Sequence, residues 1–394
     1  MNTLTRGFDA VPETRSHDEL CGLPVDRIEA HDTAFVVPFR RGIRSGTDFH
    51  AGVFDAQGDA LPHAEMKTML RASLPTREVR DAALAGAETL TGKWLFCGIA
   101  SSQFGHVITR GLGRLWATEH VPEEVQLLFV SMLYNEDQHR FLTRLLDQMG
   151  IRNCYKILQN PTHVERLITA PDLFSEASHG TATPEYAKWV RQRTIPPHDT
   201  TARRKLYITR SRLSPCVGRC LNEDLLEKNL ENAGFEIIAP ETLDLADQFK
   251  LYAEAEIIVA SEGSALHIVP FSMRDTATLV VVQRRKEVPD LIANQISSFT
   301  PARVTYVDAI RDVYWPKQRA DNLSLVSLDF LKLRDDLIAA GALDNSSSWR
   351  VPTRDEEMMS LHEGRPADAV FLSDEERAAF LRVLRRQRRA RRAA

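Results

Sequence analysis

Three groups of residues in this 394-residue chain have types and spacings suited to binding and chemistry. The first group is basic: Arg210, Arg212 and Arg219 closely follow the apolar run that ends at Thr209. Arginine presents a fork of donors that stays protonated, which suits a diphosphate. A solvated basic loop would have the same composition, so the arginines by themselves leave both interpretations open.

The second group is the run Ser261-Glu262-Gly263-Ser264-Ala265-Leu266-His267, which follows apolar residues 257–260. Small residues let a backbone approach a ligand closely, and a helix beginning here would present free N–H groups to an anion. The run matches neither a Walker loop nor the glycine pattern of dinucleotide sites. A plain tight turn explains it equally well. Glu262 has two interpretations, as a helix cap or as an acceptor of hydrogen bonds from ribose or sugar hydroxyls.

The third group consists of His106, Arg110 and Arg114, which recur every fourth residue. On a helix this spacing predicts one polar stripe. The stripe begins soon after the apolar run 93–97, and the carboxyl ends of parallel strands are where open α/β sheets bind ligands. A histidine in that place is a candidate general base.

Periodicity indicates the elements that must position these groups. In the second half, short apolar runs predict strands that alternate with helices, which favours a parallel, doubly wound sheet. Asn222 is predicted to cap the first helix, with Glu223 in its first turn. The predicted strands are Lys205–Thr209, Phe235–Ile238, Glu256–Ala260 and Thr278–Gln283.

The first half shows the same alternation more weakly. Residues 159–200 lack clear periodicity and end in Ile195-Pro196-Pro197-His198-Asp199, which indicates a linker. We therefore expect two α/β domains, residues 1–198 and 199–320, followed by a helical segment, residues 321–394. The predicted elements of the first half are strands Lys93–Cys97, Val125–Val130 and Cys154–Leu158 and helices Val107–Thr118 and Asn135–Gln148.

Composition excludes several classes of protein. Hydrophobic residues make up 43% of the chain and the net charge is −4, which is typical of a soluble globular protein and does not favour nucleic acid. Apolar stretches are too short to span a membrane, and the N-terminus lacks the apolar core of a secretion signal, so we expect a cytoplasmic protein. Cys216 and Cys220 have no CxxC or histidine partners, and no Asp-x-Asp pair occurs. We expect no metal and no cofactor.

The ordered series of these residues resembles glycosyltransferase family 61, in particular its bacterial capsular-polysaccharide branch. The resemblance covers roughly residues 90–290, and the series is far more specific than any one of its motifs. The motifs that carry it are Phe104-Gly105-His106, Gly113–Trp116, Pro161–Leu167, Tyr207–Arg212, Arg219 with Asn222-Glu223, Gly234-Phe235, Pro240-Glu241, Gln248 and Ser261–His267.

The resemblance implies a GT-B-like α/β fold, in which two Rossmann-like domains face a cleft. It implies an inverting, metal-independent hexosyl- or pentosyltransferase that moves a sugar from a nucleotide-diphosphate donor to a glycan acceptor. Residues 1–198 would form the acceptor side, with Arg110 and Arg114 at the cleft, and residues 199–320 would bind the nucleotide sugar. The implied donor-site residues are Arg210, Arg212, Arg219, Asn222, Glu223, Glu262, Gly263, Ser264, Ala265 and His267.

One position departs from the family pattern. Four residues after the histidine the family has Glu or Asp, the natural general base, whereas this chain has Arg110. Arginine cannot accept a proton at neutral pH. His106 is the best substitute because an imidazole titrates near neutral pH. Two alternatives stay open: a nucleotide-sugar epimerase, and a degenerate family member that binds a nucleotide sugar or glycan without catalysis.

The C-terminal tail is strongly basic. Residues 382–392 contain seven arginines and no acidic residue, on a helix that Ser373-Asp374-Glu375-Glu376 is predicted to open with a capping box. A solvated terminus would explain this pattern. The functional alternative is attachment to an anionic membrane surface at the inner membrane, where lipid-linked or exported glycans are built.

Overall fold

The structure is a computed structural model of the whole chain. It describes residues 22–39, 44–45, 48–68, 71–73, 75–101, 103–132, 137–214, 217–286, 290–317, 323–366 and 368–393. Cys216, the predicted helix start at Asn135 and the predicted domain boundary at 320–321 lie outside the described residues.

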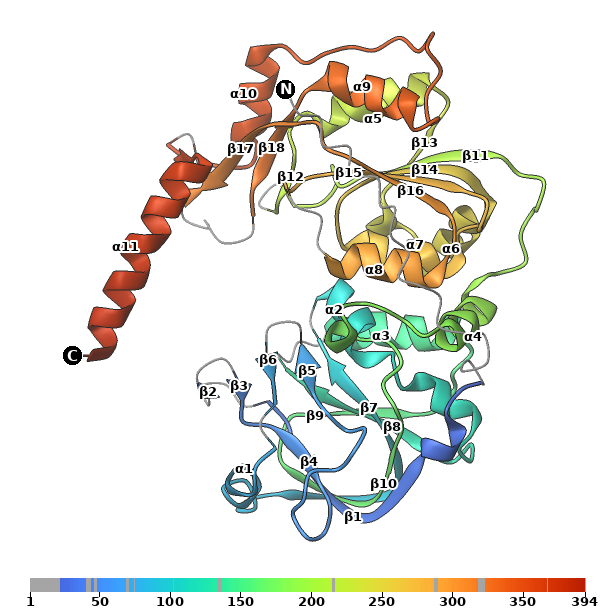
Figure 1. Cartoon of the computed structure of the whole chain (residues 1–394), viewed down its shortest axis with the longest axis vertical. Coiled ribbons are helices and arrows are strands. Elements are labelled where there is room, and N and C mark those ends of the chain that lie inside the picture. Colours follow the sequence, from blue (N-terminus) through green and yellow to red (C-terminus); the bar gives the residue numbers. More distant parts are fainter. Residues whose placement is uncertain are drawn as a thin grey trace, which may run out of the picture.

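A six-stranded sheet forms the first half of the molecule (Figure 1). Its order is β4-β1-β10-β7-β8-β9, in which β10, β7, β8 and β9 run parallel and β1 pairs antiparallel with both of its neighbours. The three strands predicted here are confirmed as β7, β8 and β9, except that Val125 and Cys154 precede β8 and β9 by one residue. The bounds are β1 Glu29–Val37, β4 Gly52–Phe54, β7 Glu88–Ala100, β8 Gln126–Ser131, β9 Tyr155–Leu158 and β10 Thr162–Thr169; two hairpins pair β2 Arg44–Ser45 with β3 Asp48–Phe49 and β5 Lys67–Thr68 with β6 Arg71–Ala72.

A five-stranded parallel sheet forms the second half, in the order β13-β11-β14-β15-β16. The four predicted strands are confirmed, and β16 adds a fifth. The predicted class, an α/β chain with parallel sheets, is therefore confirmed, whereas the facing of two domains across a cleft stays a prediction. The bounds are β11 Arg204–Ile208, β13 Glu236–Ile238, β14 Ala255–Ser261, β15 Thr278–Val282 and β16 Arg303–Val307.

Helices cover both faces of the second sheet because its strands are apolar on both sides. In β15, Leu279 and Val281 pack into the apolar cluster that contains α6, α7 and α8, and Val280 and Val282 pack against α5 and α9. The helices are α1 Arg77–Asp81, α2 Phe104–Gly111, α3 Asp137–Gln148, α4 Pro184–Thr194, α5 Glu223–Asn232, α6 Leu245–Glu254, α7 Val269–Ser272, α8 Asp290–Phe299, α9 Phe330–Ala339, α10 Arg354–His362 and α11 Asp374–Ala393, with 3-10 turns η2 Val25–Arg27, η3 Leu115–Glu119, η4 Glu176–Ser178, η5 Pro240–Thr242 and η6 Ser264–His267.

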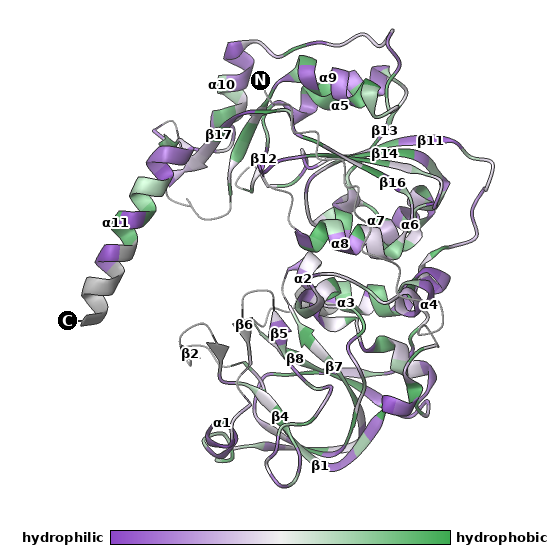
Figure 2. Ribbon diagram, viewed as in Figure 1, coloured by the Kyte–Doolittle hydropathy of each residue, from purple (hydrophilic) through white to green (hydrophobic). Residues whose placement is uncertain are grey.

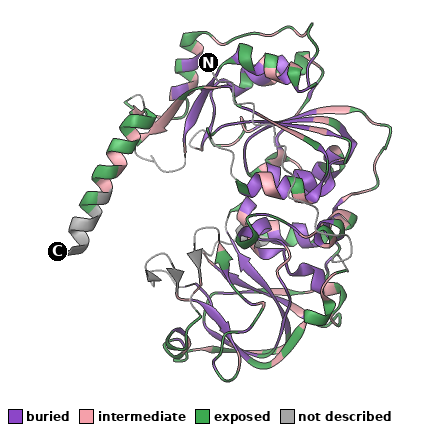
Figure 3. Ribbon diagram, viewed as in Figure 1, coloured by how far each residue is buried: buried purple, intermediate pink, exposed green. Residues whose placement is uncertain are grey.

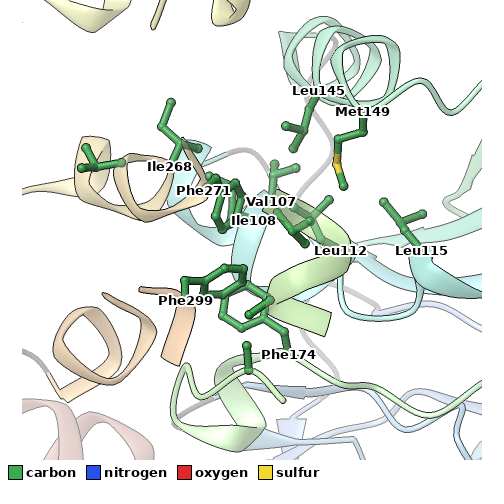
Figure 4. Packing of buried hydrophobic residues seen from close by; sticks show 14 of the residues in the cluster. Val107, Ile108, Leu112, Leu115, Leu145, Met149, Phe174, Ile268, Phe271 and Phe299 are labelled. Atoms are coloured by element: carbon green, nitrogen blue, oxygen red, sulfur yellow. The ribbon is translucent and has the colours of Figure 1, made fainter. Parts of the chain in front are cut away.

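The two halves meet through helices. Helices α2, α3 and α4 lie on the first sheet, and η6, α6, α7 and α8 lie on the second, with the two sets in contact (Figure 1). Hydrophobic residues lie along these helices in Figure 2, and Figure 3 shows much of them as buried. Phe299 of α8 packs its ring 4.8 Å from Phe271 of α7 and 5.2 Å from Phe174, which follows β10 (Figure 4). One apolar cluster therefore runs from the first sheet to the second.

A third, four-stranded sheet lies beside the second in the order β12-β18-β17-β19. It combines β12 Arg219–Cys220 and β17 Ile310–Pro316 with β18 Leu325–Leu328 and β19 Phe371–Leu372. The segment 321–394, predicted to be helical, thus also supplies two strands, because the buried run at β18 is long enough for a strand but not for a helix. The division into residues 1–198, 199–320 and 321–394 stays a prediction.

Residues 159–200 are more regular than their sequence indicates, because they contain α4 and also β10, which lies in the middle of the first sheet. The linker signal at residues 195–199 does fall between α4 and β11, outside any helix or strand. The period-two pattern of β10 is obscured by the exposed residues Glu165 and Arg166, where the pairing with β7 shifts register. An irregularity of this kind puts two polar residues side by side and removes the alternation from the sequence.

The helix predicted for Val107–Thr118 is shorter than expected. Helix α2 ends at Gly111, and a 3-10 turn begins at Leu115. At Gly113, between them, a Cβ atom would lie 2.0 Å from Asp172 Oδ1. This close approach of the chain after β10 breaks the helix, so Arg114 does not continue the stripe begun by His106.

Helix α11 projects from the body of the molecule (Figure 1). The predicted capping box is confirmed: the Ser373 amide donates to Glu376 Oε2 at 2.8 Å, and the Glu376 amide donates to Ser373 Oγ at 3.3 Å. Trp315 Nε1 donates to Asp374 at 2.8 Å and holds the start of the helix. None of the helices in the described part of the chain is long and apolar enough to cross a bilayer.

Candidate functional site

The first component of the site is a histidine–carboxylate pair. Helix α2 starts just beyond the carboxyl end of β7, which places His106 in its first turn. His106 Nδ1 lies 2.7 Å from Glu176 Oε1, and the His106 side chain is 36% exposed whereas Glu176 is 2% exposed. Thr109 Oγ1 donates to the same carboxylate oxygen at 3.2 Å. The pair therefore has a buried end and an accessible end.

Arg110 keeps Glu176 ionised. Its Nε donates to Glu176 Oε1 at 2.8 Å, from one turn beyond His106. Burial alone would raise the pKa of Glu176, but the hydrogen bond from His106 and the charge of Arg110 outweigh burial and lower that pKa to about 2. An ionised carboxylate can only accept, so the neutral ring of His106 carries its proton on Nδ1. Its Nε2 is then the basic atom.

Arg114, predicted to line the cleft, is buried within the first half instead. Its Nε donates to the His63 carbonyl at 2.7 Å and to the Ala170 carbonyl at 3.2 Å, and its Nη1 lies 3.3 Å from Asp172 Oδ2. These contacts fasten the turn after α2 to the end of β10. The role of Arg114 is to support the loop that ends in Glu176.

A close contact between two motifs joins the halves of the site. Gly105, directly before His106, packs on His267 of η6, so that a Cβ at Gly105 would lie 2.6 Å from His267 Cδ2 and 2.9 Å from Nε2. Ser264, also of η6, lies next to the same position. The sequence-predicted residues at the start of α2 and in the 261–267 turn are therefore brought together.

His267 is fixed and uncharged. Its Nδ1 lies 2.5 Å from Gln295 Oε1 of α8, and Gln295 Nε2 donates to the His267 carbonyl at 2.7 Å. Burial lowers the pKa of His267, although the bond to Gln295 opposes this shift. The two bonds leave Nε2 facing Gly105 and α2.

Arg210 lies over the same turn from the end of β11. Its Nη1 lies 2.1 Å from the place a Cβ of Gly263 would take, and its Nη2 donates to the Gly218 carbonyl at 3.2 Å. Its Nε is buried and has no partner among the described residues. Gly263 is thus required for close packing of the guanidinium rather than for an unusual backbone angle.

Arg284 and Arg285, which the sequence analysis missed, complete this edge of the sheet. They follow β15, and the rule that ligands gather beyond strand ends would have found them had it been applied to this strand. Glu262, which is fully buried, accepts from both of their amides at 3.1 Å and from Arg285 Nε at 2.6 Å. Glu262 therefore holds the loop that carries Arg284 and Arg285, and these bonds occupy both oxygens of its carboxylate.

Glu223 is also an internal residue. Its Oε1 accepts from the Tyr207 hydroxyl at 2.9 Å, the Ser261 hydroxyl at 2.6 Å and the Arg210 amide at 3.0 Å. Burial raises the pKa of Glu223, although these hydrogen bonds oppose the shift. The residue ties the ends of β11 and β14 together beneath the site.

Three other predicted donor-site residues are not part of this cluster. Arg219 Nη2 donates to the Ser360 carbonyl at 3.0 Å and to Glu363 at 2.6 Å, and Asn222 Nδ2 donates to the Glu356 carbonyl at 3.1 Å. Asn222 precedes α5 as predicted, but its side chain does not cap that helix. Both residues hold α10, and Arg212 is exposed on the turn after β11.

The described residues contain no group of three or more His, Cys, Asp or Glu side chains arranged for a metal ion. Cys220 is buried, and burial raises the pKa of its thiol. The absence of a metal from the reaction stays a prediction.

Comparison with known proteins gives one family match. The family model described as Glycosyltransferase 61 matches residues 104–280, a stretch that contains His106, Glu176, Arg210 and His267. No curated protein matches the chain. One solved structure with some likeness, E. coli heptosyltransferase WaaC with ADP, is 9% identical and covers 55% of this chain and 94% of its own, with a TM-score of 0.28. A likeness this weak carries no argument.

Proposed function

We propose that this chain, whose residues 104–280 match the Glycosyltransferase 61 family model, transfers a sugar, with inversion, from a nucleotide-diphosphate donor to a glycan acceptor. The observation that carries the proposal is the His106–Glu176 pair, which lies beside the contact between Gly105 and His267 at the junction of the two halves. A base on one half and arginines at the strand ends of the other are the parts that such a transfer requires.

The reaction follows from this arrangement. The acceptor hydroxyl gives its proton to His106 Nε2 while its oxygen attacks the anomeric carbon. The bond from that carbon to the diphosphate oxygen breaks, and its electrons leave on the diphosphate. Glu176 accepts from Nδ1–H and stabilises the imidazolium that forms, and Arg210 stabilises the leaving charge. Attack from the side opposite to the leaving group inverts the anomeric carbon.

Glu176 also accounts for the basic residue at position 110. The family pattern places an acidic residue there, whereas this chain brings a carboxylate to the same turn of α2 from η4. Arg110 then holds that carboxylate in its charged form. This supports an active enzyme over a degenerate binding module, whose main support was the presence of Arg110.

The proposal is tested by nucleoside diphosphate release. Purified protein is incubated in EDTA with a panel of UDP-, GDP-, CDP- and dTDP-sugars and a bacterial polysaccharide extract as acceptor. We expect release with at least one donor, acceptor-dependent and undiminished by EDTA. His106→Ala should slow release by a factor of about 10²–10⁴, the scale of general-base catalysis. Glu176→Gln should also slow release.

His120→Ala, an exposed histidine on the same half, is the matched control and should keep full activity. Donor binding by calorimetry should survive in His106→Ala, because the donor arginines lie on the other half. Full turnover in His106→Ala would place the base elsewhere. Sugar isomerisation without any acceptor would instead identify an epimerase.

A further inference from the structure

The end of β15 carries a buried cation that the fold leaves uncompensated. Arg284 is 7% exposed, and its Nε and Nη1 have no hydrogen-bond partner among the described residues. Burying a guanidinium without hydrogen-bond partners is costly, because nothing in the low-dielectric interior replaces its lost hydration. A buried charge without partners indicates a ligand that supplies the missing hydrogen bonds and negative charge.

Neighbouring charges offset the charge of Arg284 only in part. Burial and the charges of Arg210 and Arg285 lower its pKa to about 10, and the opposing charge of Glu262 does not outweigh them. Two carboxylates lie beside these three arginines, and neither bonds the Arg284 guanidinium. Glu262 accepts from Arg285 and from two backbone amides, and Glu223 accepts from two hydroxyls and the Arg210 amide. The strand ends therefore carry an excess of positive charge.

The backbone leaves room for two guanidiniums side by side. Arg284 Nη1 lies 2.4 Å from the place a Cβ of Gly218 would take, and Arg210 Nη2 donates to the carbonyl of that same glycine. Gly263 makes the equivalent room for Arg210. Two glycines thus allow two forked donors to converge at the carboxyl ends of β11, β14 and β15.

We propose that Arg284 and Arg210 form the anchor for the diphosphate of the donor, with Arg284 as the buried half of the site. The geometry fits a diphosphate because two adjacent phosphoryl groups can each accept from one fork and together neutralise the excess charge. The inference rests on the proposed function for the identity of the ligand, but it adds a residue that neither the family match nor the sequence motifs assign.

The experiment measures binding and stability of the full chain without any transfer reaction. Inorganic pyrophosphate and UDP are titrated by calorimetry into wild type and Arg284→Gln. The matched control is Arg303→Gln, an exposed arginine at the opposite end of the same sheet. We expect Arg284→Gln to weaken pyrophosphate binding by about 10- to 100-fold, the scale of charge-assisted bonds, and Arg303→Gln to bind as wild type does.

The melting temperature of the ligand-free protein provides a second readout. Because Arg284 is uncompensated when the site is empty, Arg284→Gln should melt at or above the wild-type temperature while losing the stabilisation given by pyrophosphate. A lower melting temperature with unchanged pyrophosphate affinity would make Arg284 a purely structural residue and overturn the inference.

Different results would reject the inference about Arg284 and the proposed function. Pyrophosphate binding that depends on Arg284, without sugar transfer by any donor, would uphold the anion site and remove the transferase assignment. Sugar transfer by Arg284→Gln with an unchanged KM for the donor would uphold the transferase and reject Arg284 as its diphosphate anchor.

Discussion

At the scale of single residues, Arg110 and Glu176 depend on each other. Glu176 is buried with its charge intact because Arg110 donates to it. Arg110→Glu, which restores the acidic residue of the family pattern, would put two carboxylates together instead. We expect a loss of about 3–5 kcal/mol in the free energy of unfolding, measured with urea, and reduced turnover.

Arg110→Lys serves as the control. We expect a smaller loss of stability because lysine keeps the positive charge, but some loss because it lacks the forked donors of arginine. A rise in activity in Arg110→Glu would contradict the His106–Glu176 pair as the catalytic unit and assign the base to position 110.

Sequence reasoning found His106 but not its partner. Glu176 lies 70 positions away on a 3-10 turn, and a lone glutamate in an irregular stretch carries no local signal. Arg210 and the turn that contains His267 lie close together because both follow strands, and the carboxyl ends of neighbouring parallel strands lie at one edge of the sheet. Arg219 and Asn222 also follow a strand end in sequence, but their partners on α10 lie more than 130 positions further on.

At the scale of elements, the contact between α2 and η6 sets the distance between His106, the proposed base, and Arg210 on the other half. Gly105→Ala should push the two elements apart, because His267 is held by Gln295 and cannot move away. Alanine is otherwise the better helix former, so a loss of stability would report the contact itself. We expect a loss of about 1–3 kcal/mol in urea unfolding and a fall in turnover.

A double-mutant cycle with His267→Ala provides the control for this contact. Removing the ring makes room for the new methyl group, so the double variant should recover part of the stability lost in Gly105→Ala. Wild-type stability and turnover in Gly105→Ala would show that the two elements do not touch in solution.

Elements with regular patterns were predictable and those with interrupted patterns were not. All strands of the parallel sheet except β16 were visible as apolar runs, because both of their faces are covered by helices. The register shift in β10 hid a central strand, and the contact at Gly113 shortened α2. Both exceptions arise where the chain makes close contacts with distant residues.

At the scale of the whole molecule, α11 gives an acidic protein a basic extension. The helix stands away from the body (Figure 1), and residues 382–392 contain seven arginines. Each basic residue near an anionic bilayer contributes roughly 1 kcal/mol. We expect the full chain to sediment with phosphatidylglycerol vesicles at low salt and to dissociate at high salt, where charges are screened.

Replacing these seven arginines by glutamine preserves the length of the helix and should abolish sedimentation. Neutral phosphatidylcholine vesicles are the lipid control. Equal sedimentation of the variant, or of wild type with neutral vesicles, would reject attachment through the tail.

The apolar cluster that joins the two sheets has a consequence for how the protein is made. The ribosome completes α2, α3 and α4 well before it adds Phe271 and Phe299. The surface that these two rings cover in the finished protein is therefore exposed to water during synthesis. At bacterial and eukaryotic rates of elongation the interval is on the order of ten seconds. During this interval the first half of the nascent chain has an exposed apolar face. Partly synthesised chains with such a face bind chaperones or aggregate.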